Sequence, residues 1–169
     1  FENTCETFAD PLIAQFDLDV TKGFTVAGWV KFDATQSGQI TIWFISYGIK
    51  FFGLEFNFDS LHLFSHTGDD TFVSYPSDGA WHFYRAWVDT SGILNLQLDN
   101  LGIIQSTGSA YVNSVCDKFQ LQGDTTAIPD TLNMFDETGY WQRVLSTTEG
   151  SNLYNGGAGI TFGNPLMPP

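Results

Sequence analysis

Basic side chains, cysteines and long apolar runs are all scarce in this chain. Six Lys and Arg stand against 19 Asp and Glu, which gives a formal net charge of −13. Because such a surface repels phosphate backbones and anionic lipid, we expect neither nucleic acid nor a membrane surface as a partner. No apolar run approaches the ~20 residues of a membrane-spanning helix, so membrane insertion is not expected. Two cysteines are too few for a scaffold built on disulfides.

Aromatic side chains, in contrast, are abundant. They make up 16% of the 169 residues, and most are Phe, whose flat rings suit pleated, half-buried surfaces. This length supports one domain with a sizeable core and is short for two, so residues 1–169 are predicted to form a single domain. The aromatic content predicts a thick apolar core, with some Trp and Tyr left over for a binding surface.

Short segments of strand character are separated by turn residues along most of the chain. In residues 93–99, Leu94, Leu96 and Leu98 alternate with mostly polar side chains, after an aromatic-rich strand and the turn at residues 89–92. This alternation predicts an antiparallel sheet with one buried face. Further strands are predicted at residues 24–32, 39–47, 50–58, 61–65, 71–75, 102–106, 110–116, 118–122, 134–142 and 158–162.

One helix is predicted near the end of the sequence. Ser146 with Glu149 three residues later fits a capping box, which indicates about two helical turns over residues 146–154. Short strands at turn-marked intervals with a single helix are typical of all-β proteins. The predicted fold is therefore an antiparallel two-sheet β-sandwich of the jelly-roll type with one short C-terminal helix.

Three stretches resemble the laminin G-like (concanavalin A-like lectin) superfamily, in the same order along the chain. They are residues 24–32 with Trp29, residues 81–100 from Trp81-His82 to Asp99-Asn100, and residues 135–154 with Phe135-Asp136-Glu137, Tyr140, Leu145, Glu149 and Leu153-Tyr154. Asn100 replaces the Gly that is usual in the second stretch. These are packing motifs, so Trp29, Trp81 and Leu153 are predicted to lie in the core.

The resemblance implies the concanavalin A-like sandwich and a role in binding glycans or proteins, at loops or on the concave sheet face, often with bound Ca²⁺. It also implies an extracellular, cell-surface or virion-surface location. In such a location Cys5 and Cys116 either form one long-range disulfide or stay as buried free thiols.

Three carboxylates form a candidate calcium site. Ca²⁺ takes six to eight oxygen ligands. Asp17 and Asp19 precede the first long strand, and Asp136 lies on the closing strand, which in the resembling family lies near the first. We therefore predict Asp17, Asp19 and Asp136 as metal ligands. The alternative is that they are solvated turn carboxylates that keep the domain soluble.

A sugar site needs aromatic faces beside groups that orient hydroxyls. Trp43 and Tyr47 are predicted to share one side of their strand, opposite Ile40, Ile42 and Phe44. The predicted ligand-binding residues are Trp43, Tyr47, Asp69, Asp70 and Tyr75. The alternative is that Trp43 is buried beneath the second sheet.

Catalysis is not expected. The spacing of Glu55, Asn57 and Asp59 resembles the strand carboxylates of retaining glycoside hydrolases, and all three are predicted to point to one face. Asn57, however, cannot act as the central acid, and Asp59 is shorter than a Glu acid/base. The three histidines have no nucleophile to serve, and His82 is expected to pack or hydrogen-bond within the sheet.

These observations predict a non-catalytic recognition module of a larger secreted or surface-exposed assembly. Its expected partner is a glycan or a glycoprotein surface, with a role in adhesion. The alternative is a structural domain that contacts other protein subunits, as in a virion or a surface appendage. A relative of the glycoside hydrolases is the third and weakest interpretation.

Overall fold

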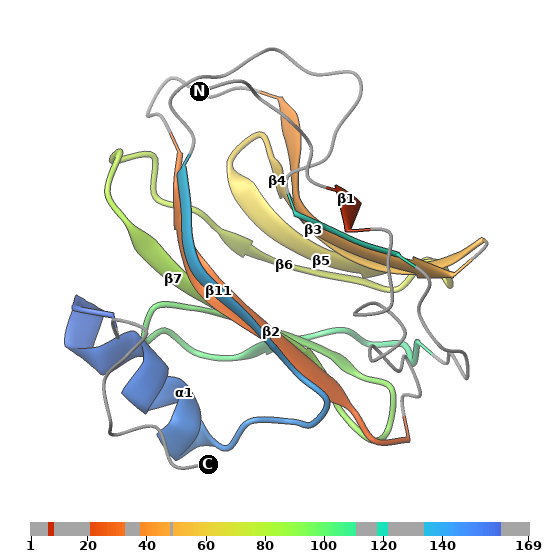
Figure 1. The fold of residues 1–169 in the computed structure, drawn as a ribbon. Coiled ribbons are helices and arrows are strands. Elements are labelled where there is room, and N and C mark those ends of the chain that lie inside the picture. The colour runs from red at the N-terminus through yellow and green to blue at the C-terminus, as the bar shows by residue number, and fades with distance from the viewer. Residues whose placement is uncertain are drawn as a thin grey trace.

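In the computed structural model the chain forms two antiparallel sheets that face each other (Figure 1). The structure describes residues 7–8, 21–32, 38–47, 49–110, 118–121 and 134–159; for residues 7, 8, 47 and 118–120 it describes the backbone alone. Among these residues there is no helix long and apolar enough to cross a bilayer. All but the first residue of the predicted strand at 110–116, and most of the predicted strand at 158–162, lie outside these residues.

One sheet has six strands, in the spatial order β1-β10-β3-β4-β5-β6. Their bounds are β1 Thr7–Phe8, β3 Gln39–Tyr47, β4 Lys50–Asn57, β5 Ser60–Ser65, β6 Asp70–Ser74 and β10 Lys118–Leu121. The other sheet has five strands, in the order β11-β2-β7-β8-β9. Their bounds are β2 Phe24–Lys31, β7 His82–Val88, β8 Leu94–Leu98, β9 Ile104–Gln105 and β11 Met134–Trp141.

The core lies between the two sheets and follows the predicted alternation. Phe24, Val26 and Val30 of β2 point inward, and Leu94, Leu96 and Leu98 of β8 meet Phe52, Leu54 and Phe56 of β4 in one buried cluster. The turn before β8 also forms as predicted: Gly92 donates to the carbonyl of Asp89, and the Asp89 carboxylate accepts from two further amides. The predicted two-sheet sandwich is confirmed.

The helix α1 (Thr147–Tyr154) covers the outer face of the five-stranded sheet, followed by a 3₁₀ turn, η2 (Asn155–Gly157) (Figure 1). Ser146 is its N-cap, and the Glu149 side chain completes the predicted capping box. A second apolar cluster joins Ala27, Trp29 and Phe83 of the sheet to Leu153 and Tyr154 of α1. The chain therefore has a third layer, built on the outward residues of β2 and β7.

Candidate functional site

The aromatic residues predicted to bind sugar do not form a surface. Trp43 is 0% exposed and packs in the core. The prediction of its face was wrong because β3 carries a β-bulge: the pairing with β4 shifts between Thr41 and Trp43, so Ile42 is an extra residue. A bulge reverses the in-out alternation beyond it, which turns Trp43 and Ile45 inward and Phe44 outward.

The other described members of that set are buried or hydrogen-bonded to their own neighbours. Tyr75 is 5% exposed, and its ring packs on Phe32 and Phe56. Asp69 accepts a hydrogen bond from Thr67, and Asp70 pairs with His62 at 3.1 Å. The side chain of Tyr47 lies outside the described residues.

The metal and disulfide predictions fall largely outside the described residues. Asp17, Asp19, Cys5 and Cys116 are not described, whereas Asp136 lies on β11. Within the described ranges, no three His, Cys, Asp or Glu side chains gather closely enough to hold a metal ion.

The carboxylate spacing of a glycoside hydrolase is not realised on β4. The strand ends at Asn57, Phe58 has a positive φ of 56°, and Asp59 lies in the following turn, where its carboxylate accepts from Ser60. The expectation that Asp59 shares one strand face with Glu55 was therefore wrong. Glu55 is buried and accepts hydrogen bonds from Gln39 and Asn57.

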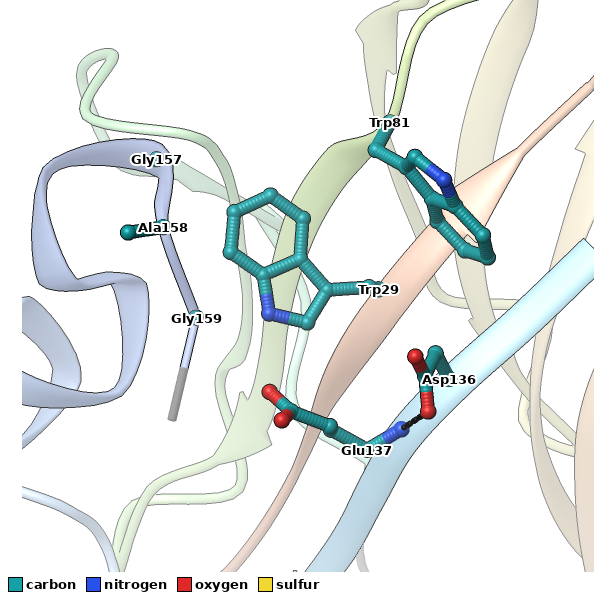
Figure 2. Close-up of a pocket in the computed structure, with 7 residues that line it drawn as sticks. All are labelled: Trp29, Trp81, Asp136, Glu137, Gly157, Ala158 and Gly159. Carbon is teal, nitrogen blue, oxygen red and sulfur yellow. Dashed lines mark hydrogen bonds between the residues drawn. The ribbon is translucent and has the colours of Figure 1, made fainter. Parts of the chain in front are cut away.

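A pocket on the outer side of the five-stranded sheet brings together two indoles and two carboxylates (Figure 2). We call it the indole pocket; its volume is about 190 Å³, and it is lined by Trp29, Trp81, Asp136, Glu137, Gly157, Ala158 and Gly159. Sites for drug-sized ligands usually span ~300–1,000 Å³. The indole pocket therefore suits one small polar ring rather than an extended chain.

Trp29 is a rigid part of this pocket. It is 7% exposed, and its indole stacks on Tyr154 of α1, with ring centroids 5.9 Å apart, and lies against Phe83 of β7 at 5.4 Å. Because β2 pairs with β11 on one side and β7 on the other, its backbone is held by both neighbours. Trp29 is in the core, as predicted, but one part of its ring borders the pocket.

The two carboxylates reach the same pocket because of a second bulge. Asp136 lies directly opposite Trp29, and the pairing of β11 with β2 shifts between Asp136 and Gly139. Consecutive residues of a regular strand point to opposite faces, whereas a bulge redirects a side chain. Glu137 has a φ of 49°, and its amide donates to the Asp136 carboxylate at 2.8 Å.

A glycine loop after α1 closes the other side of the pocket. Gly159 has a φ of 66°, and a Cβ built there would lie 2.9 Å from Glu137 Oε2 and 3.1 Å from Trp29 Nε1. Figure 2 shows the Glu137 carboxylate directed toward the indole nitrogen of Trp29. Only a residue without a side chain leaves this corner open.

Trp81 is the accessible aromatic residue of the pocket. It is 39% exposed and precedes β7, so the prediction that it lies in the core was wrong. Its neighbour His82 is buried, and both ring nitrogens face carboxylates: Nδ1 lies 2.7 Å from Asp99 and Nε2 lies 3.1 Å from Asp78. His82 therefore links the loop that contains Trp81 to the end of β8. The prediction that His82 hydrogen-bonds within the sheet is confirmed.

The protonation of His82 follows from this geometry. Burial lowers its pKa, but the hydrogen bonds to Asp99 and Asp78 raise it by more, so the net pKa lies above the ordinary value. An imidazolium with two N–H donors satisfies both carboxylates at once.

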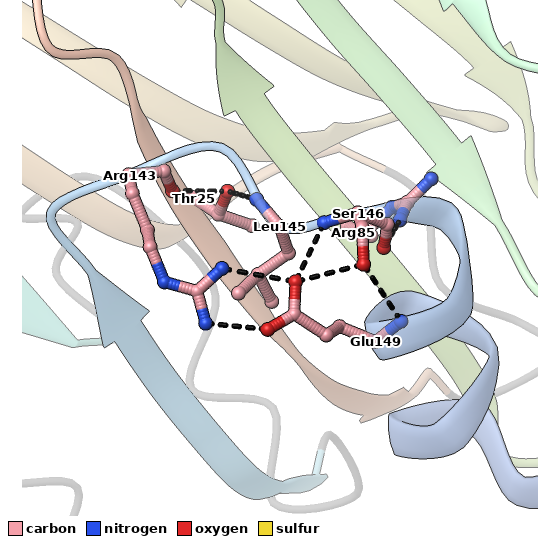
Figure 3. A network of polar contacts seen from close by, with 6 residues as sticks. All are labelled: Thr25, Arg85, Arg143, Leu145, Ser146 and Glu149. Atoms are coloured by element: carbon pink, nitrogen blue, oxygen red, sulfur yellow. Dashed lines mark hydrogen bonds and ion pairs between the residues drawn. The ribbon is translucent and has the colours of Figure 1, made fainter.

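The end of the chain that supplies the glycine loop is anchored by a polar network (Figure 3). The Arg143 guanidinium makes two bonds to Glu149, at 2.9 and 2.5 Å, and Glu149 also accepts from the backbone and hydroxyl of Ser146. Thr25 of β2 bonds the backbone of Arg143 and Leu145. The buried Arg85 of β7 donates to the carbonyl of Ser146 at 3.1 Å. This network attaches α1 to the sheet beside the pocket.

The two facing antiparallel sheets, with the one helix of the described residues, form a jelly-roll β-sandwich, and solved structures with this fold match the chain. Domains LG4-5 of the mouse laminin alpha1 chain match with a TM-score of 0.58 and 19% identity, over 84% of this chain and 40% of that one. The predicted resemblance is thus confirmed at the level of the fold.

Two botulinum neurotoxin structures match in the same way. One concerns type C, whose cell entry depends upon interaction with two ganglioside molecules (TM-score 0.63, 13% identity, 80% of this chain and 36% of that one). The other is the binding domain of neurotoxin DC in complex with rat synaptotagmin II (0.60, 14%, 82% and 37%). This chain spans well under half the length of these three structures. No protein-family model and no curated protein sequence matches it.

Proposed function

We propose that this chain is a non-catalytic recognition module that binds a glycan in the indole pocket. The observation that carries the proposal is the exposed indole of Trp81 beside two carboxylates and a glycine loop. An aromatic face stacks on the apolar side of a sugar ring, while carboxylate and backbone groups hydrogen-bond its hydroxyls. The size of the pocket favours one sugar residue at the end of a glycan.

The structural neighbours support a binding role in two ways. Cell entry of one neurotoxin depends upon interaction with gangliosides, which carry glycans, and the binding domain of another was solved in complex with a protein, rat synaptotagmin II. At 13–14% identity these neighbours share the fold, so their ligands are models for the kind of partner and not its identity. A secreted or surface-exposed location is part of the same proposal.

Replacing Trp81 by Ala is the direct test. Loss of the stacking face should weaken binding to an immobilised glycan panel about threefold to tenfold, measured by surface plasmon resonance. Phe72→Ala is the matched control, because Phe72 is a 56% exposed aromatic residue on the other sheet and should leave affinity unchanged.

A second pair of variants fills the pocket instead of emptying it. Gly159→Ala places a methyl group against Glu137 and Trp29, whereas Gly156→Ala has a similar positive φ and open space around it. Binding should fall in the first variant and persist in the second. Equal binding by wild-type protein, Trp81→Ala and Gly159→Ala would place the ligand elsewhere and contradict the proposal.

An assembly role is the second candidate, because Leu101, Ile103 and Ile104 are exposed around the short edge strand β9. Exposed edge strands and apolar side chains are suited to protein contacts. Self-association that is lost in Ile103→Ser, together with no response to any glycan, would favour this candidate.

A further inference from the structure

The charge of the indole pocket has one sign. Asp136 and Glu137 are the charged members of its described lining. The six basic residues of the chain are Lys22, Lys31, Lys50, Arg85, Lys118 and Arg143, and all six, like the three histidines, belong to the described part, Lys118 by its backbone on β10 of the other sheet. The segments outside that part contain no Lys, Arg or His and cannot contribute a basic side chain to the pocket.

The basic residues nearest in the fold are paired with other groups or do not line the pocket. His82, next to Trp81, faces the carboxylates of Asp78 and Asp99, which balance its charge. Arg85 is buried, donates to the carbonyl of Ser146 and stacks over Trp87 at 4.5 Å, while Arg143 is paired with Glu149. Lys31 lies two residues beyond Trp29 on the same face of β2 but does not line the pocket. The pocket therefore keeps a negative potential on a chain whose net charge is −13.

The aromatic lining adds to this preference. The face of an indole carries negative π density and attracts a cation within about 6 Å of the ring. Figure 2 shows the Asp136 carboxylate directed toward the space between Trp29 and Trp81. A positive group there would meet indoles and carboxylates together, and a negative group would be repelled by both.

Given the proposed glycan function, we propose that the indole pocket selects a terminal amino sugar, a single ring with a free ammonium group, over neutral and acidic sugars. The ring stacks on Trp81, and the ammonium group donates to Asp136 and Glu137. N-acetylation removes the positive charge and adds bulk in a pocket of about 190 Å³. A carboxylated sugar such as a sialic or uronic acid places like charges together.

The test uses two matched sugar series, gluco and galacto, each as the 2-amino, 2-acetamido and 2-hydroxy sugar on an otherwise identical linker, plus a sialylated glycan and choline. Affinities are measured by microcalorimetry or array binding at low and high salt. We expect the amino sugar of one series to bind about tenfold more tightly than its acetamido partner, with the advantage reduced in high salt because screening weakens charge interactions.

Charge variants test the assignment to the pocket. Asp136→Asn keeps an oxygen that can accept the hydrogen bond from the Glu137 amide but removes a charge. The affinity of the amino sugar should therefore fall close to that of its acetamido partner. Asp70→Asn removes the same charge from the other sheet and should change nothing. Lys31→Gln should act in the opposite direction and tighten binding of the amino sugar.

The outcomes separate the two proposals. If no sugar of either series binds, the proposed glycan function fails, and this inference fails with it. If neutral or sialylated glycans bind as well as amino sugars, or if Asp136→Asn leaves the preference intact, glycan binding stands and the selection of amino sugars is wrong. If choline competes as well as the amino sugar, the pocket recognises a cation without reading the sugar ring, which also overturns the proposal.

Discussion

Trp43 and Trp81 are the same residue type in opposite environments. Trp43 is 0% exposed within the core, while Trp81 is 39% exposed at the rim of the indole pocket. Sequence patterns assigned these roles the other way round. The alternation of β3 placed Trp43 outside because the extra residue Ile42 gives no clear sign of a bulge. A family packing motif placed Trp81 inside.

The candidate site was only partly predictable from the residues. Asp136 was identified as a functional carboxylate, although as a calcium ligand, and it does lie in the pocket. Glu137 was missed because adjacent strand residues are expected on opposite faces, and its φ of 49° is a property of the folded chain. The paired Asp-Glu before a Thr-Gly step was the one available signal, since Gly often marks a bulge.

His82 should titrate above its ordinary pKa. Because its folded pKa is raised, its contribution to stability is fully present below the unfolded value of about 6.5 and is lost as pH rises through the folded pKa. We expect Asp78→Asn to lower the pKa of His82, measured by NMR of the imidazole ring, and to reduce the fall in melting temperature on the alkaline side.

Asp70→Asn is the matched control for this titration, since Asp70 pairs with His62 and not with His82. A His82 pKa at or below 6.5 in the wild-type protein would contradict the two hydrogen bonds from His82 to Asp78 and Asp99.

At the scale of elements, strands and turns were predicted with good accuracy. Residues 39–47 form β3 at the expected bounds, and residues 24–32 and 134–142 each shorten by one residue to β2 and β11. Clear alternation and turn residues define such segments locally. The bulges depend on pairing between strands distant in sequence, and β1 is two residues long. Neither leaves a distinct local pattern.

The helix α1 carries its own pH-dependent anchor. The hydrogen bonds from Arg143, and then those from Ser146, lower the pKa of Glu149 to about 2. A depressed carboxyl pKa stabilises the folded state above the unfolded value, which is near 4.5, and this contribution is lost as pH falls through the folded value.

Glu149→Gln should therefore flatten the dependence of melting temperature on pH between about 4.5 and 2, because Gln can still complete a capping box but cannot pair with Arg143. Thermal unfolding followed by circular dichroism across this range measures the effect. The same acid dependence in wild-type and variant proteins would show that the Arg143–Glu149 pair does not stabilise α1.

At the scale of the whole molecule, the sequence was sufficient to predict the two facing sheets and the one helix found in the described residues. Alternating strands determine which faces meet, and a sandwich is the arrangement that buries them. The third layer was harder to predict. The sequence does not show that the outward aromatic residues of β2 and β7 pack against α1 rather than between the two sheets.

The predicted calcium site of Asp17, Asp19 and Asp136 joins distant parts of the sequence, so it is tested on the full chain. A metal that binds the native state alone raises the melting temperature by mass action. If these carboxylates hold Ca²⁺, adding it should raise the transition and EDTA should lower it, in scanning calorimetry of the full chain. Asp19→Asn should remove the response. An unmoved transition with EDTA would exclude the site.

The uneven exposure of the five tryptophans gives the protein a built-in optical reporter. Four indoles are buried or half-buried, and Trp81, at 39% exposure, is the most accessible of the five. Its fluorescence should lie at longer wavelength than that of the others and be the most open to a soluble quencher. A ligand that covers Trp81 would shift the emission toward the blue and shield it from quenching, so occupancy of the pocket could be followed in solution without any label.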